Sequence, residues 1–209
     1  MQNSSFDLIR HGGFMMIPLL ISALVALTLI FERLYYFKKV YAVSKTELTK
    51  LESLVRAQKF TLDHARSNPA TETPIASLFA VGATSFHFPP DELEKTLARR
   101  AQLWMSPLEK RLEVLDTIIT AAPLMGLLGT ITGMMASFKV LSTAGVNEPN
   151  AITGGVAEAL IATATGLVIA LFCLLFYNYF NSKVRETVDA MESFANLILE
   201  QKSGHKPKP

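Results

Sequence analysis

The sequence predicts an all-α membrane protein with three transmembrane helices that extend into long cytoplasmic helical segments. Its composition is the first reason: half of the 209 residues are hydrophobic, only 18% are charged, and the mean hydropathy is +0.30. The second reason is that the stretches 12–31, 117–138 and 159–180 contain no charged residue. Each is 20–22 residues long, which is enough to cross a hydrocarbon layer of about 30 Å.

The distribution of Lys and Arg predicts the orientation of these spans. Residues 33–111 contain 13 of them, whereas the loop between the second and third spans contains Lys139 alone. Cytoplasmic loops carry the excess of basic residues, so 33–111 should be cytoplasmic. The first span should be retained as a signal anchor, because it lacks a basic leader and a small-residue cleavage site. The expected segments are a periplasmic N-terminus (1–11), the first span (12–31), a cytoplasmic helical segment (32–116), the second span (117–138), a periplasmic loop (139–153), the third span (154–180), and a cytoplasmic C-terminal helix and tail (181–209).

The cytoplasmic segment should consist of packed helices. The spacing of apolar residues predicts a helix over 45–60, and prolines and small polar residues predict a loop over 67–74. Residues 75–86 are apolar but too few to span a membrane. A new helix should begin near Asp91 and run unbroken into the second span, with Pro107 bending it rather than ending it.

Small and polar residues follow one face of each of the last two spans. They could let two helices pack closely, with the threonine hydroxyls bonded to their own helix. They could instead line a narrow, partly wet lumen, with Thr130 and Thr163 as its polar groups. The further residues expected to face that lumen are Pro123, Gly126, Gly133 and Ser137 in the second span and Gly155, Ala159 and Gly166 in the third.

Glu158 lies at the edge of the third span and also has two interpretations. A carboxylate there is costly to bury and usually faces an interior path or a partner, which would add Glu158 to the groups along the lumen. Alternatively, Glu158 is an exposed acid at the start of a helix, where the helix dipole favours negative charge.

Several functional classes find no support in the sequence. The run 126–133 has glycines but no following lysine and no preceding strand, so nucleotide binding is not expected. The four histidines are scattered, and nothing resembles a nucleophile with its base, so we predict no enzyme. Cys173 is the only cysteine, and no metal-ligand spacing exists. No cofactor and no nucleic acid partner are expected.

Two motifs resemble those of a known family. Residues 122–138 (APLMGLLGTITGMMASF) resemble the second-span signature of the TolQ/ExbB/MotA proton-channel family. Residues 155–167 (GVAEALIATATGL) resemble the third-span signature of its ExbB/TolQ branch, and Tyr177-Asn178 matches the end of that span. The sequence departs from the pattern at 170–173, where many relatives carry a proline. It also has no fourth span, which argues against the MotA branch.

The resemblance implies a function and a set of partners. The chain would form a pentameric ring around a pore and act as the channel subunit of a motor driven by the proton-motive force. In this family threonines of the last two spans line the pore, which corresponds to Thr130 and Thr163, and the acid corresponds to Glu158. A single-span partner of the ExbD/TolR type would supply the proton-carrying aspartate. A TonB/TolA-type energy transducer is also implied. A non-conducting scaffold that anchors partner helices is the alternative.

Overall fold

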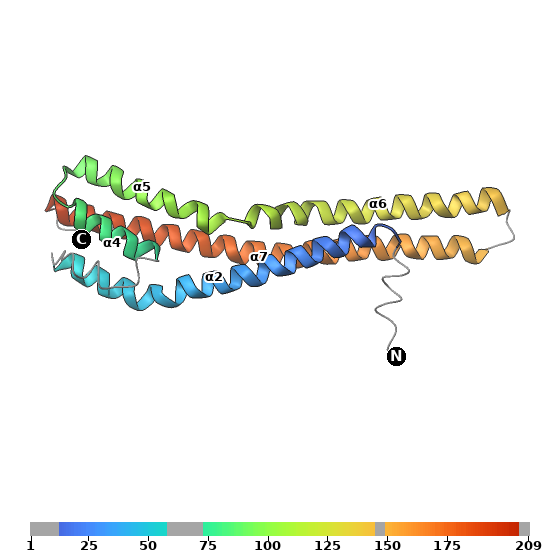
Figure 1. Cartoon of the computed structure of the whole chain (residues 1–209), viewed down its shortest axis with the longest axis horizontal. Helices are drawn as coiled ribbons and strands as arrows, with labels where there is room; N and C mark the ends of the chain where they lie inside the picture. Colours follow the sequence, from blue (N-terminus) through green and yellow to red (C-terminus); the bar gives the residue numbers. More distant parts are fainter. Residues whose placement is uncertain (1–12, 58–72, 145–148, 205–209) are drawn as a thin grey trace, which may run out of the picture. The chain divides into compact units, whose positions relative to one another are not determined.

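The computed structural model of the chain describes residues 13–57, 73–144 and 149–204, and these are helical almost throughout (Figure 1). Three of the helices are long and apolar enough to cross a membrane, which confirms the predicted fold class. The expected N-terminal segment 1–11, most of the expected loop 67–74 and the last five residues lie outside the described residues. The helices are α2 (Met16–Arg56), α4 (Pro74–Ser85), α5 (Pro90–Glu109), α6 (Leu112–Ala144) and α7 (Pro149–Ser203).

The chain divides into two compact units. One, the membrane unit, comprises Met1–Phe31 and Arg111–Tyr179. The other, the bundle unit, comprises Glu32–Lys110 and Phe180–Pro209. Because α2 and α7 are long, each contributes residues to both units.

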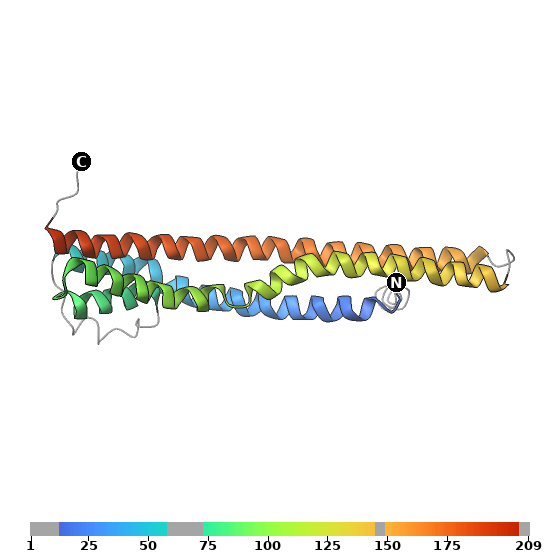
Figure 2. The same ribbon diagram turned by 90° about the horizontal axis from the view of Figure 1, so that it is seen from above.

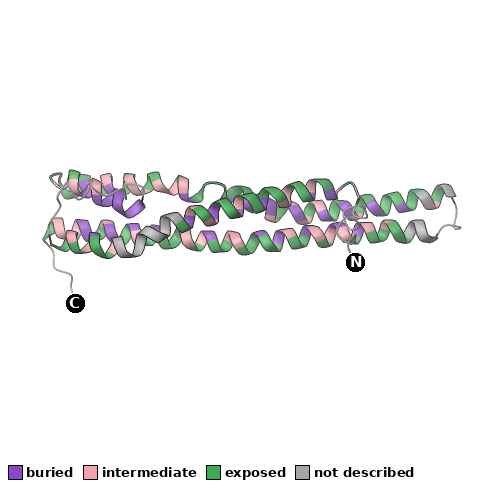
Figure 3. Cartoon of the chain, turned by 60° about the horizontal axis from the view of Figure 1, so that its bottom comes forward, coloured by how far each residue is buried: buried purple, intermediate pink, exposed green. Residues whose placement is uncertain are grey.

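The bundle unit has an apolar core of the kind found in soluble proteins. Leu78 and Phe79 of α4 pack there with Phe194 and Ile198 of α7, and all four are almost fully buried. Most of α4 is buried, as the purple colour in Figure 3 shows. The apolar segment at 75–86, expected to be too short to span a membrane, therefore lies in the core of the bundle unit as α4.

Two polar contacts fix the start of α4 in this core. The Thr73 hydroxyl accepts a hydrogen bond from the Ala76 amide at 3.3 Å, and Pro74 occupies the first turn, where its missing N–H costs nothing. The buried Ser77 hydroxyl accepts a hydrogen bond of 2.7 Å from the Trp104 indole. That bond ties α4 to α5 and satisfies two polar groups that would otherwise be costly to bury.

The expected continuous helix from Asp91 into the second span is interrupted, which corrects the prediction. α5 ends at Glu109 and α6 begins at Leu112, with Arg111 at a positive φ of 68° between them. A helix that ends leaves its last carbonyl groups without amide donors. Arg33 supplies donors instead: its Nη1 lies 3.0 Å from the Pro107 oxygen and 3.4 Å from the Leu108 oxygen. Only 3% of Arg33 is exposed, and its guanidinium also lies over the Tyr36 ring.

In the membrane unit, α6 and the first part of α7 run antiparallel and side by side (Figures 1 and 2). Glycines bring their backbones into contact. A Cβ added at Gly126 would lie 3.0 Å from the Ala162 oxygen, and one at Gly166 would overlap the Ala122 oxygen. Such close approach maximises dispersion contacts where lipid offers no hydrophobic driving force between helices. We call this contact the glycine seam; it comprises Ala122, Gly126, Gly129, Gly133 and Ser137 of α6 with Gly155, Ala159, Ala162, Thr163 and Gly166 of α7.

Outside the glycine seam, the membrane unit presents large apolar side chains. Leu124 of α6 is 65% exposed and Val168 of α7 is 67% exposed. A continuous surface of such apolar side chains is unfavourable in water, but it is compatible with the hydrocarbon interior of a membrane. The outer surface therefore agrees with the three predicted spans.

The glycine seam predicts a contrast between two glycines of α7. Gly166→Ala should lower the apparent melting temperature in detergent, because the new methyl group overlaps the Ala122 carbonyl and overpacking costs about 1–3 kcal/mol. Gly154→Ala is the matched control, since nothing lies within 4 Å of its added Cβ and alanine favours a helix by about 1 kcal/mol. Equal melting temperatures for the two variants would contradict the tight seam.

The cap at the end of α5 predicts a local effect of Arg33→Met. Hydrogen bonds to a charged group contribute about 1.5–3 kcal/mol. Their loss should speed amide exchange around residues 106–112 by at least about tenfold, measured by hydrogen–deuterium exchange. Lys38→Met, at an exposed position on the same helix, should leave this exchange unchanged. Unchanged exchange in Arg33→Met would show that the cap contributes nothing.

Candidate functional site

Thr163 is the polar group that joins the two sides of the glycine seam. Its hydroxyl donates to the Gly126 carbonyl on α6 at 2.9 Å, so it bonds across the helices rather than to its own helix. The absence of a side chain at Gly126 makes this possible, because an added Cβ would lie 3.0 Å from the Thr163 Cα. Thr163 is half-buried, so one side of it stays accessible beside the seam.

Thr130 behaves differently from Thr163. Its hydroxyl donates to the Leu127 carbonyl of its own helix at 2.7 Å. Because Thr163 is level with Gly126, Thr130 lies one turn, about 6 Å, further along α6. No hydrogen bond joins the two hydroxyls within the described part of the chain. Thr130 and Thr163, which were predicted to line one lumen, therefore lie about one helical turn apart along the α6–α7 hairpin.

Glu158 lies against the N-terminal side of α2. A Cβ added at Gly13 would overlap the Glu158 carboxyl group, so the two residues are in direct contact. Gly13 has a φ of +70°, and its carbonyl accepts from the Met16 amide at 3.1 Å in the turn that starts α2. Only glycine combines this backbone conformation with room for the neighbouring acid.

The bounds of α7 remove one interpretation of Glu158. The helix begins at Pro149, so Glu158 lies more than two turns inside it. The dipole effect on a charge falls off within the first turn. Glu158 is therefore not an acid at a helix start; it is half-buried and in contact with Gly13, and its role in a proton path stays a prediction.

The small residues of the predicted stripe form the glycine seam. Six of the seven pack against the other helix of the same chain, which is the close-packing alternative from the sequence; the seventh, Pro123, is half-buried beside them. That the stripe also borders a lumen stays a prediction. The six packed residues are Gly126, Gly133, Ser137, Gly155, Ala159 and Gly166.

The sequence interpretation missed two glycines that make close contacts, Gly129 and Gly13. A Cβ at Gly129 would lie 2.6 Å from the Ala162 Cβ and 3.4 Å from the Met15 Cβ, so all three membrane-unit segments meet there. The spacing of Gly126, Gly129 and Gly133 could have indicated this position. Nothing in the sequence before α2 could have indicated that Gly13 contacts Glu158.

The described residues hold no cluster of three or more His, Cys, Asp or Glu side chains that could bind a metal ion. The polar groups along the glycine seam are hydroxyls and backbone carbonyls, and Glu158 is the residue before Ala159 of the seam. A hydroxyl both donates and accepts hydrogen bonds, and a carboxyl group does so when it is protonated.

Comparison with known proteins identifies a family for this chain. Residues 70–193 match the model of the MotA/TolQ/ExbB proton channel family. The chain is 36% identical over 174 residues to the putative biopolymer transport protein ExbB-like 3 of Synechocystis sp., covering 82% of each chain. It is 32% identical over 143 residues to the Tol-Pal system protein TolQ of Pseudomonas aeruginosa, covering 63% of this chain and 62% of the relative. It is also 40% identical over 79 residues to the biopolymer transport protein ExbB of Aquifex aeolicus, covering 38% of this chain and 53% of the relative.

These matches span both the bundle unit and the membrane unit. With three helices able to cross a membrane, they make the chain a multi-pass inner-membrane protein of the ExbB/TolQ branch, and the family is one of channels rather than enzymes. The chain therefore belongs to the MotA/TolQ/ExbB proton channel family.

Proposed function

We propose that this chain is the ring-forming channel subunit of an inner-membrane motor driven by the proton-motive force. A pentamer of it would surround the single helices of an ExbD/TolR-type partner. Proton transfer through that assembly would energise a TonB/TolA-type transducer for biopolymer transport or envelope maintenance. The names of its relatives, which refer to biopolymer transport and the Tol-Pal system, support this role.

The observation that carries the proposal is the Thr163 hydroxyl at the glycine seam. It is a polar group placed among charge-free spans, where polar side chains are costly and usually functional. The stretches 117–138 and 159–180 contain no carboxylate, so in our proposal the proton carrier at the level of Thr163 belongs to the partner. Because the Thr163 hydrogen is already donated to the Gly126 carbonyl, a protonated partner aspartate would donate to the Thr163 oxygen on its accessible side.

The proposed orientation places the N-terminus and the loop 139–153 outside and the bundle unit in the cytoplasm. Thirteen basic residues between the first two spans, against one in that loop, support this orientation. Protons would then enter from the outside near Glu158 and pass Thr130 before Thr163. Each charge that crosses 100 mV releases about 2.3 kcal/mol, enough to bias a conformational cycle of the partner relative to the ring.

Reconstitution in liposomes tests the proposal. The chain would be purified with its co-purifying single-span protein, and a pH-sensitive dye inside the vesicles would report proton entry under a potassium diffusion potential. We expect gradient-driven acidification only when both proteins are present. No flux from the complete assembly would instead favour the non-conducting scaffold.

Thr163→Val should assemble normally, because valine has nearly the same shape as threonine. Its gradient-driven flux should fall by at least about tenfold, because valine lacks the hydroxyl group. Thr163→Ser retains the hydroxyl and should keep most of the flux. Thr165→Val is the matched control, since Thr165 lies two residues from Thr163 on the other side of α7 and its hydroxyl bonds within its own helix at 2.8 Å. Full flux in Thr163→Val would remove this residue from the path. Thr130→Val should lose flux less severely.

Glu158→Ala should impair flux, and Glu158→Gln should recover only part of it, because glutamine keeps the size but cannot carry a proton. Both would be measured at matched membrane abundance, with exposed Glu200→Ala as a control that keeps full flux. Gly13→Ala should reproduce part of the loss, since its methyl group displaces the Glu158 carboxylate. Wild-type flux in both Glu158 variants would remove the acid from the mechanism.

A further inference from the structure

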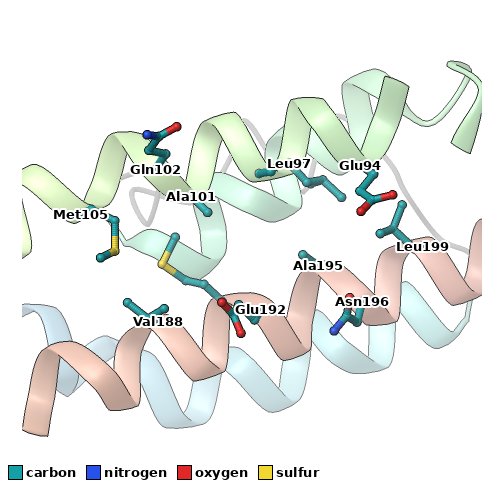
Figure 4. A pocket seen from close by; sticks show the side chains of 12 residues that line it. Glu94, Leu97, Ala101, Gln102, Met105, Val188, Glu192, Ala195, Asn196 and Leu199 are labelled. Atoms are coloured by element: carbon teal, nitrogen blue, oxygen red, sulfur yellow. The ribbon is translucent and has the colours of Figure 1, made fainter. Parts of the chain in front are cut away.

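The bundle unit carries an open groove that the described residues leave unfilled. The groove lies between α5 and α7 and has a cavity volume of about 500 Å³. Its floor is apolar and stepped, with small Ala98 and Ala101 beside Met105 on α5 and Val188 and Ala195 on α7. Figure 4 shows these side chains along the two helices. Small residues between larger ones form the type of hole into which a helix inserts a side chain.

The rim of the groove is acidic. Glu94 of α5 and Glu192 of α7 line it, and both are exposed. Neither forms an ion pair within the described part of the chain. The occupant should therefore be an apolar side chain accompanied by a basic one.

The opposite face of α5 carries that combination. Leu103 is 61% exposed, and Tyr35 is the other large apolar side chain that is mostly exposed in the described part of the bundle unit. Arg99 lies one turn before Leu103 on the same side of the helix and is exposed. Arg99 likewise has no ion-pair partner in the described residues. The groove residues Ala98, Ala101 and Met105 lie on the other side.

We propose that the groove binds a second copy of this chain, with Leu103 of each copy inserted between α5 and α7 of the next and Arg99 facing Glu192. The contact joins two different surfaces, so it is head-to-tail, the type of contact from which a closed ring of the proposed function is built. The inference deepens the proposed ring-forming function by naming the surfaces that assemble it.

The positions of the two surfaces along the helix agree with this arrangement. All copies share one bilayer, so rotation about the membrane normal keeps each residue at its own depth. Leu103 must therefore meet the part of the groove near residues 102 and 105, which lies inside the lined segment of α5. Figure 4 shows Met105 across the groove from Val188, and Glu94 close to Leu199. By this order Arg99 comes level with the turn of α7 that carries Glu192.

Disulfide crosslinking of the full chain in its native membrane tests the contact. Cys173 is the only cysteine and is buried, so Cys173→Ala gives a suitable background. Adding Leu103→Cys with Val188→Cys should give a ladder of covalent multimers after oxidation. Each variant alone should give none, because the contact is head-to-tail. Leu103→Cys with Ser193→Cys is the matched control and should stay monomeric, since Ser193 is exposed on the side of α7 away from the groove.

Charge reversal supplies a second readout that does not depend on disulfide geometry. Glu192→Arg should lower the fraction of multimer in gently extracted membranes by at least about fivefold, because like charges across an interface oppose association. Adding Arg99→Glu should restore it. The readout is the mass of the extracted complex, so it remains informative when proton flux is absent for other reasons.

Four results would overturn the proposal. They are dimers from Leu103→Cys alone, an equal ladder from the control pair, a Val188→Cys adduct with a different protein in place of the ladder, and unchanged multimer mass after Glu192→Arg. Proton flux that persists alongside any of them would leave the channel function standing and reject only this interface.

Discussion

The direct contact between the α6 and α7 backbones is the constraint on which the membrane unit depends. Residues without side chains at Gly126 and Gly166 remove the usual separation between two helices. That proximity lets the Thr163 hydroxyl reach a carbonyl of the other helix, which a wider spacing would prevent. The glycines thus hold the hairpin together and also place its polar group.

A similar link between packing and polarity governs the bundle unit. The interruption between α5 and α6 releases carbonyl groups, and a buried arginine from α2 binds them. The bundle also has an apolar core that excludes water, as soluble helical proteins do. One chain therefore uses two different stabilising forces, dispersion between close backbones in the membrane unit and apolar burial in the bundle unit.

The membrane unit lacks an acid inside its second and third charge-free stretches and holds Glu158 at their edge. This division follows from energetics, because an ionisable group far inside the hydrocarbon is costly without a permanent partner. Glu158 is placed by contact with Gly13 at the start of another helix. In our proposal the costly interior carboxylate belongs to a second protein, which leaves this chain to supply hydroxyls and shape.

The sequence by itself determined the helical class and the three spans, because charge-free length reflects the thickness of the bilayer directly. It also determined the family, through two motifs of specific spacing. Only the tertiary structure decided how the small residues are used, since one helix face can serve either packing or a lumen. It also decided the break after α5 and the position of Glu158. Arg33 and Gly13 are far in sequence from the groups they contact, so local patterns carry no signal for these pairs.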